Sequence, residues 1–337
     1  MVKRIFVVTF LLVSSALAQQ QQFASIGDFK LVSGETIRDC RIGYRTFGTP
    51  NARKSNVILF PTWAGGNTEQ LSANFAPGKL VDTSKYYVIA VDALSNGVSS
   101  SPSNSRLQPH MHFPEITIRD MVNTQHYLLT NVLGIKHVYA VMGISMGGMQ
   151  TFQWMTAYPD FMDKAIPIVG SPQMGAYDVL QWHMQIGAIE DNPAWKHGDY
   201  TSDPGKLANT EFAMLRLTTP QHVNESHTPQ EVLEDLEKEK SKPSLDANDK
   251  IRQTEAMMAI DLARDFGGSL EAAAHAVKAK TMIVVSRYDH TVTPDSARKF
   301  AQFMNVPVIE LTGDCGHLAT ACEEGKLQAA VEQFLQQ

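Results

Sequence analysis

The sequence is poor in cysteine, in net charge and in long apolar runs, and each shortage excludes a class of protein. Three cysteines in 337 residues, Cys40, Cys315 and Cys322, are too few for a disulfide scaffold and show no metal-ligand spacing. The formal net charge of −6 lacks the basic excess that nucleic acids and anionic membranes attract. Apolar residues are plentiful, at 43% of the chain, which is enough for a large core. We therefore expect a globular protein with no metal site and no nucleic-acid partner.

The one long apolar run lies at the N-terminus. Two basic residues precede apolar residues 5–13, and Ala16-Leu17-Ala18 follows. A charged start, a short apolar stretch and an A-x-A cleavage pattern are typical of a secretory signal peptide, and the run is too short to span a bilayer. We expect cleavage near Ala18 and an exported protein, periplasmic or secreted, with no membrane contact after cleavage. Export permits a disulfide between Cys315 and Cys322, and free thiols are the alternative.

Apolar strands alternate with amphipathic helices over most of the remaining chain. This alternation predicts a mostly parallel sheet with helices on both faces. It stops after a strand expected over 164–169 and resumes with one over 281–286, and the helix-rich block between them is too long for a simple crossover. We interpret that block as an inserted helical cap. The predicted division is a signal peptide (1–18), a flexible N-terminus (19–28), a first core part (29–173), the cap (174–265) and a second core part (266–337).

One pentapeptide follows a predicted strand, at the carboxyl edge of the sheet where active sites of this fold class lie. An apolar strand over 138–142 runs into Gly143-Ile144-Ser145-Met146-Gly147, and a helix follows until Pro159. A G-x-S-x-G sequence between a strand and a helix is the context of a nucleophile elbow. The N–H groups at the start of the helix point to the place where an oxyanion would form. We predict that Ser145 is a nucleophile for acyl transfer, and a small-residue packing turn is the alternative.

A serine nucleophile needs a base, and the base needs an acid that holds its tautomer. After a strand–serine–helix elbow these partners follow in the order acid, then histidine. Asp289 follows the strand over 281–286, and His317 follows the next strand, so both fall at the carboxyl edge of the sheet. We predict Asp289 as the acid and His317 as the base. Asp314 is the rival acid and His290 the rival base.

The oxyanion of an acyl-transfer intermediate needs two backbone N–H donors. The first is expected from Met146, the residue after the serine. The second is expected from the loop Thr62-Trp63-Ala64, which follows a buried strand over 56–60. We assign the second donor to Trp63 and name Thr62 as a substrate-binding candidate.

Two motifs and several shorter segments match the pattern of one known family. The motifs are Phe113-Pro-Glu-Ile-Thr-Ile-Arg-Asp120 and Ser145-Met-Gly-Gly-Met-Gln150, and the match extends over nearly all of the mature chain, including Arg41–Gly48 and Gly316-His317. The chain resembles the homoserine O-acetyltransferase branch of the α/β-hydrolase superfamily. The resemblance implies an α/β-hydrolase fold with an inserted helical cap, a Ser145–His317–Asp289 triad and an acyl-enzyme intermediate. It implies no metal or tightly bound cofactor. It hints at a homodimer through the cap, and a cap that packs only on its own core is the alternative.

The sequence departs from the acetyltransferases where they hold their amino-acid substrate. The loop Pro61-Thr-Trp-Ala-Gly65 replaces their His-Ala-Leu-Thr-Gly, and Leu318 stands where they tend to carry an Asp. Their cap tends to carry Thr-Tyr-Arg, and the nearest stretch here is Leu217–Pro220, with Arg216 just before it. A pocket for a carboxylate and an ammonium group needs paired charges. Arg216 is the remaining candidate for a charged substrate contact.

The sequence thus predicts an exported serine hydrolase that cleaves a small ester, thioester or amide, with water as the acyl acceptor. Export favours water because acetyl-CoA is a cytoplasmic co-substrate. The alternative is homoserine O-acetyltransferase, or a related acyltransferase that uses acetyl-CoA, which an Arg216 or Arg119 beside Ser145 would favour. The remote alternative is a non-enzymatic binding protein on a hydrolase scaffold. The natural acyl donor and acceptor do not follow from the sequence.

Overall fold

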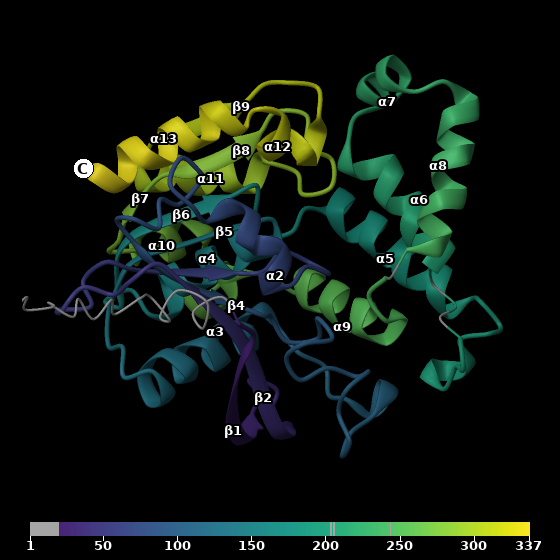
Figure 1. Cartoon of the computed structure of the whole chain (residues 1–337), viewed down its shortest axis with the longest axis horizontal. Helices are drawn as coiled ribbons and strands as arrows, with labels where there is room; N and C mark the ends of the chain where they lie inside the picture. The colour runs from purple at the N-terminus through teal and green to yellow at the C-terminus, as the bar shows by residue number, and fades with distance from the viewer. Residues whose placement is uncertain (1–19, 203, 205, 243) are drawn as a thin grey trace, which may run out of the picture.

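A nine-stranded sheet lies at the centre of the computed structural model, which describes residues 20–337 except 203, 205 and 243 (Figure 1). The strands are β1 (Gln22–Lys30), β2 (Thr36–Phe47), β3 (Val57–Pro61), β4 (Tyr87–Val91), β5 (Val138–Ile144), β6 (Met162–Ile168), β7 (Lys280–Thr281), β8 (Ile283–Ser286) and β9 (Val308–Leu311). Their order is β1-β2-β4-β3-β5-β6-β8-β9, with β7 paired to β6. β2 pairs antiparallel with β1 and β4, and the other pairs are parallel. The predicted mostly parallel sheet is confirmed.

Helices cover both faces of the sheet. In the core they are α2 (Thr68–Leu71), α3 (Ile118–Tyr127), α4 (Met146–Ala157), α10 (Leu270–His275), α11 (Asp295–Met304), α12 (Ala319–Cys322) and α13 (Glu324–Gln336). On β3, Leu59 belongs to the hydrophobic cluster of Phe152 and Phe300, which lie on α4 and α11. Its neighbour Ile58 belongs to the opposite cluster, with Val331 of α13. Alternate strand residues therefore enter two separate apolar layers, as in a sheet buried on both faces.

Between β6 and β7 the chain leaves the sheet and forms α5 (Ala176–Glu190), α6 (Lys206–Leu217), α7 (Pro220–Ser226), α8 (Pro229–Ser241) and α9 (Ala247–Met258). We call α5 to α9 the cap. Figure 1 shows α6, α7 and α8 standing together on one side of the core, with α5 and α9 nearer the sheet. Gln173 and Asp261, on either side of the cap, form an isolated antiparallel bridge. The insertion therefore leaves the core and returns to it at one point.

The N-terminal region differs from the sequence prediction. The predicted signal peptide, residues 1–18, lies outside the described residues. The predicted flexible segment, residues 19–28, is wrong for most of its length, because β1 begins at Gln22 and pairs with β2. The register of this pair shifts around Gly27, so the strand lacks the regular alternation by which a strand is detected in a sequence. None of the described helices is long and apolar enough to cross a membrane.

Candidate active site

Ser145 lies on a strained turn between β5 and α4. Its φ of 59° and ψ of −120° fall outside the regions that serine usually adopts. A Cβ on Gly143 would lie 2.6 Å from the backbone of Gly147, and a Cβ on Gly147 would lie 2.6 Å from the carbonyl oxygen of Pro61, so both positions require glycine. The Ser145 N–H donates to the Ile168 carbonyl at 2.9 Å. The turn holds the serine hydroxyl at the carboxyl end of β5, where the residue stays partly exposed.

The structure brings the three predicted side chains together in one hydrogen-bonded chain. His317 Nε2 lies 2.8 Å from Ser145 Oγ, and His317 Nδ1 lies 2.6 Å from Asp289 Oδ2. The other carboxylate oxygen of Asp289 accepts the backbone N–H groups of Thr291 and Val292 at 2.8 and 2.9 Å. His317 and Asp289 are both buried. Asp289 is thus fixed on one side by the backbone and faces the histidine with the other side.

The two rivals named in the sequence analysis lie elsewhere. Asp314 Oδ1 is 3.4 Å from His222 Nδ1 of α7, so this carboxylate faces the cap and not His317. His290 Nε2 is 3.4 Å from the carbonyl oxygen of Leu215. Neither rival belongs to the hydrogen-bonded chain of Ser145.

The loop that carries His317 is held from three sides. Gly316 has a φ of +60°, and a Cβ there would lie 3.1 Å from the backbone of Thr218 in the cap. Ser286 Oγ donates to the Gly316 carbonyl at 2.6 Å. Cys315 and Cys322 form a disulfide across the loop, so the bridge that the sequence left open is present. These contacts limit the motion of the histidine relative to Ser145.

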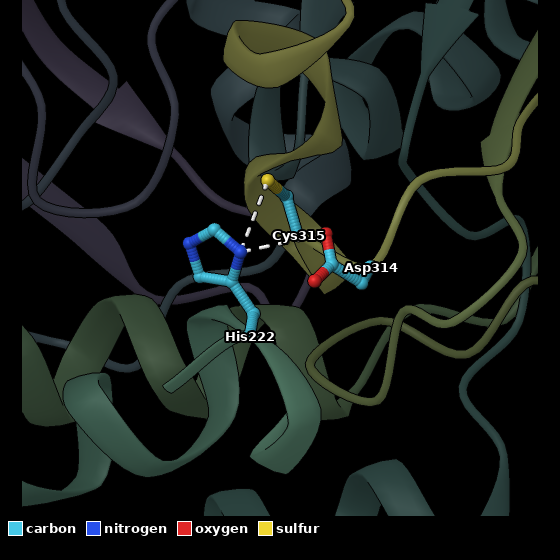
Figure 2. A group of neighbouring side chains, drawn as sticks. All are labelled: His222, Asp314 and Cys315. Carbon is cyan, nitrogen blue, oxygen red and sulfur yellow. Dashed lines mark hydrogen bonds and ion pairs between the residues drawn. The ribbon is translucent and has the colours of Figure 1, made fainter. Parts of the chain in front are cut away.

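Three side chains of the kinds that bind metal ions lie where the cap meets this loop. Figure 2 shows His222 of α7 beside Asp314 and Cys315, whose potential ligand atoms all lie within 4.8 Å of one another. Cys315 belongs to the disulfide, so it offers no thiolate. Thr219 Oγ1 also donates to the Asp314 carbonyl at 2.6 Å. We therefore interpret the group as a structural contact that holds the start of α7 against the loop of the histidine.

The two backbone donors predicted for an oxyanion lie in adjacent segments. The N–H groups of Met146 and Trp63 have no hydrogen-bond acceptor among the described residues. Gln150 Nε2 donates to the Thr62 carbonyl at 3.0 Å and to the Met146 carbonyl at 3.1 Å, so one amide joins the loop after β3 to the first turn of α4. Free N–H groups beside a serine hydroxyl are what an oxyanion hole requires. The bridging role of Gln150 was not predicted, because it depends on the contact between the two segments.

The assignment of Thr62 to substrate binding is corrected by the structure. Thr62 is fully buried, and its Oγ1 accepts the Ala93 N–H at 3.0 Å. Its own N–H donates to the Val91 carbonyl at 3.1 Å. Thr62 therefore fastens the loop after β3 to the end of β4 and has no exposed surface for a substrate.

Arg216 lies at the end of α6 and is buried. Its guanidinium carbon is 3.8 Å from the centre of the Trp182 ring, and Nη2 donates to Gln185 Oε1 at 3.0 Å. Burial lowers the pKa of Arg216 to about 10. The other arginine considered, Arg119, forms an ion pair with Asp265 at 3.2 Å. Arg216 thus keeps its charge without a carboxylate among the described residues, whereas that of Arg119 is paired.

A cleft of about 1060 Å³ lies between α6, α7 and α8 and reaches the loop of the histidine. Leu318, the residue after His317, lines the cleft and is 41% exposed. Met214 and Val223 add apolar surface, and charged side chains of both signs, including Glu211, Asp235 and Lys250, also line it. The cleft therefore combines apolar and charged surface, and Leu318 connects it to the loop of the histidine.

Comparisons with known proteins agree with this geometry. A model of the family described as alpha/beta hydrolase fold matches residues 56–320. The chain is 31% identical to the ethyl acetate hydrolase of Pseudomonas veronii, over 81% of this chain and 82% of that protein. It is 29% identical to a homoserine O-acetyltransferase of Acidiphilium cryptum, over 93% of this chain and 94% of that protein. The solved structure of the acetyl esterase MekB superimposes with a TM-score of 0.89 at 28% identity, over 95% of this chain and 98% of that chain. The similar proteins thus include both hydrolases and acetyltransferases.

Proposed function

This chain belongs to the α/β-hydrolase fold family, in its homoserine O-acetyltransferase-like branch, and we propose that it is an esterase that hydrolyses a small acyl ester. Its relatives are esterases and acyltransferases, so an enzyme of acyl transfer is the broader conclusion. The observation that carries the proposal is the hydrogen-bonded chain Asp289–His317–Ser145 beside two unpartnered backbone N–H groups.

In the proposed reaction, His317 Nε2 takes the proton from Ser145 Oγ as the oxygen attacks the ester carbonyl. Asp289 holds the Nδ1 proton and stabilises the imidazolium. The N–H groups of Met146 and Trp63 bind the oxyanion of the tetrahedral intermediate. The imidazolium then gives its proton to the departing alcohol, which leaves an acyl group on Ser145. A water molecule, activated by the same histidine, releases the acid and restores the serine.

Hydrolysis is favoured over acetyl transfer to homoserine by the surroundings of the serine. Leu318 presents apolar surface to the cleft at the position where the acetyltransferases tend to carry an Asp. The charge of Arg119 is paired with Asp265. The predicted export adds a second argument, since an exported enzyme meets water and not acetyl-CoA. Export and localisation rest on the N-terminal sequence alone.

The proposal is tested by acid release from p-nitrophenyl acetate and from ethyl acetate, with Ser145→Ala as the control. We expect steady release by the wild-type enzyme and none above background by the variant. If the wild-type enzyme released no acid from either ester, or if Ser145→Ala retained the activity, the proposed function would be wrong.

Homoserine O-acetyltransferase is the second candidate. It is supported by the length of the match to the Acidiphilium cryptum enzyme and by the buried, uncompensated charge of Arg216. The discriminating assay supplies acetyl-CoA and L-homoserine and measures O-acetylhomoserine. We expect none. Serine-dependent formation of O-acetylhomoserine would make this second candidate the correct one.

A homodimer through the cap is part of the proposal. Tyr177, Leu180 and Met184 are 55%, 61% and 54% exposed and recur along one face of α5. An apolar helix face of this kind is suited to contact with a second copy. Light scattering after size exclusion should give the mass of a dimer, and Leu180→Asp should shift it toward the monomer. A monomeric wild-type protein would exclude the dimer.

A further inference from the structure

A chain of buried hydrogen bonds runs from the interior of the core to the segments of the two expected oxyanion donors. Trp154 Nε1 donates to Gln125 Oε1 at 2.8 Å, and Gln125 Nε2 donates to Gln150 Oε1 at 2.5 Å. Gln150 Nε2 then donates to the carbonyls of Thr62 and Met146 at 3.0 and 3.1 Å. The three side chains of this relay are at most 1% exposed, so water does not compete for their bonds. The reaction steps proposed above use none of them.

The direction of this relay is fixed by its first member. An indole N–H can only donate, whereas a glutamine amide offers both an acceptor and a donor. Because Trp154 donates, Gln125 turns its oxygen to the indole and its NH2 group to Gln150. Gln150 therefore accepts with its oxygen, and its NH2 group is left to donate to the two carbonyls. A reversed Gln150 amide would place NH2 against NH2, and oxygen against two carbonyl oxygens, in a dry interior, which is costly.

The bond to the Thr62 carbonyl determines where the Trp63 N–H points. The two groups belong to one peptide unit, and in a planar trans peptide they point in opposite directions. The Thr62 carbonyl has no other hydrogen-bond partner among the described residues. The bond from the Thr62 N–H to Val91 and the bond from the Gly66 N–H to the Trp63 carbonyl hold the neighbouring peptide units instead. Gln150 thus supplies the hydrogen bond that holds this unit against rotation.

We propose that Gln150 is a positioning residue that holds the Trp63 N–H toward the oxyanion. Trp154 sets the direction of Gln150 through Gln125. The inference rests on the proposed esterase function, because the oxyanion forms only during acyl transfer. If the peptide unit rotated by half a turn, the Thr62 carbonyl oxygen would face the oxyanion and repel it. One of the two donors would be lost, and attack by the serine would be slower although the triad was unchanged.

The test compares ethyl acetate with O-ethyl thioacetate, in which sulfur replaces the carbonyl oxygen. Sulfur is larger and a weaker acceptor than oxygen, so donors placed for an oxyanion stabilise the sulfur analogue less. The quantity measured is the ratio of kcat/KM for the oxygen ester to kcat/KM for the sulfur ester, divided by the same ratio for hydrolysis by hydroxide. We expect about a hundredfold or more for the wild-type enzyme. A wild-type ratio near one would mean that no oriented donors act on the oxyanion, and it would overturn the inference.

The variants then assign this preference to the relay. Gln150→Met keeps the approximate volume of the side chain and removes its donor, so kcat for ethyl acetate should fall about ten- to a hundredfold at nearly constant KM, and the oxygen-to-sulfur ratio about tenfold. Gln125→Met should lower the ratio by about three- to tenfold, because the Gln150 amide is then free to reverse. Gln153→Met is the matched control, since Gln153 lies on the same helix but lines a separate pocket beside α3. It should keep the wild-type ratio.

A merely structural role of these glutamines would give a different result. Loss of folded protein lowers the rates with both esters equally, so the oxygen-to-sulfur ratio would stay at the wild-type value. Thermal denaturation checks that each variant unfolds cooperatively, and titration with a fluorophosphonate counts the active sites. A wild-type ratio in Gln150→Met would overturn the inference. A wild-type ratio in Gln125→Met alone would overturn the part of it that concerns Trp154.

A labelling rate separates this inference from the proposed function. When a fluorophosphonate reacts, Ser145 Oγ bonds to phosphorus, fluoride leaves and the phosphoryl oxygen takes the place of the oxyanion, so no ester is needed. We expect Gln150→Met to be labelled about tenfold or more slowly than the wild-type protein, and Gln153→Met at the wild-type rate. Slow labelling of Gln150→Met, in a protein that hydrolyses no ester, would reject the esterase and keep the inference. Ester hydrolysis with equal labelling rates and an unchanged ratio would do the reverse.

Discussion

The candidate catalytic groups of the core and the buried arginine of the cap differ in how completely their polar atoms are hydrogen-bonded. In the core, Asp289, His317 and Ser145 bond to one another, and the second oxygen of Asp289 accepts two backbone N–H groups. In the cap, Arg216 keeps two buried N–H groups without an acceptor among the described residues. Groups that perform one chemical step work best when they are already held in place. The buried arginine of the cap is not held in this way. We therefore attribute the chemistry to the core.

The largest expected effect comes from Ser145→Ala, which removes the attacking oxygen of the core and leaves the cap unchanged. We expect kcat for p-nitrophenyl acetate to fall by about 10,000-fold to a millionfold, because the attacking oxygen is lost. The free energy of unfolding should change by less than about 1 kcal/mol, since the turn is held by backbone hydrogen bonds. Steady-state kinetics and urea denaturation measure both quantities. A variant with most of its activity would place the nucleophile elsewhere.

The next largest effect on kcat is expected at Asp289, which faces His317, and Asp314, which faces the cap, provides the comparison. Asp289→Asn should lower kcat by about a thousand- to ten-thousandfold, because the amide no longer holds the correct tautomer of His317. Asp314→Asn, the matched control, should stay within about threefold, since its carboxylate faces His222 of the cap. Ester hydrolysis by the two purified variants gives both values. The opposite ranking would transfer the acid role to Asp314.

A third prediction concerns Asp249, which fastens α9 to the core. The N–H and hydroxyl of Ser103 donate to its carboxylate at 2.9 and 2.6 Å. Burial raises the pKa of Asp249 from 3.8 to about 7, so the folded state holds this proton more tightly than the unfolded state. Ionisation of this carboxyl group therefore destabilises the folded state. The cost grows as the pH rises from about 4 to about 7 and reaches its full size above about pH 7.

Asp249→Asn removes this cost and keeps the side-chain shape, with the amide oxygen accepting the Ser103 N–H and the amide nitrogen donating to the Ser103 hydroxyl oxygen. We expect the variant to raise the free energy of unfolding at about pH 8 by on the order of 4 kcal/mol, and by less than half of that at about pH 5. Urea denaturation of both proteins at the two pH values measures the difference. An equal change at both values would mean that the carboxyl does not titrate in this range.

The smallest expected effect comes from the disulfide beside His317. Replacing both Cys315 and Cys322 by serine should lower the free energy of unfolding by about 2 kcal/mol, because the bridge closes a short loop in the unfolded chain. We expect kcat to fall only a few-fold, since Ser286 and the cap still hold Gly316. Wild-type protein under reducing conditions should behave like the variant. Loss of all activity would show that the bridge alone positions the histidine.

The catalytic candidates could be predicted because their signals are local. The strand, glycine-flanked serine and helix around Ser145 follow one another in the sequence, and chain order ranks the acid and the base after it. The oxyanion donors also follow from position, one after the serine and one after β3. The rival Asp314 could be set aside only in three dimensions, since its distance from His222 depends on how α7 meets the loop.

The surroundings of Arg216 and of Thr62 could not be predicted, because they depend on contacts between distant segments. Arg216 was a candidate only by resemblance, and its stacking on Trp182 requires α5 and α6 to pack together. Thr62 was misjudged because a threonine in an active-site loop can either face a ligand or fasten the backbone, and the contact with Ala93 decides.

The most direct test of the central claim is labelling with a fluorophosphonate, followed by peptide mapping. Such a probe phosphonylates a serine that is activated by a base, with loss of fluoride, whatever the natural substrate is. The account predicts one label per chain on Ser145, no label in Ser145→Ala, and much slower labelling in His317→Ala. Absence of labelling in the wild-type protein, or a label on another residue, would contradict the assignment of the chemistry to the core.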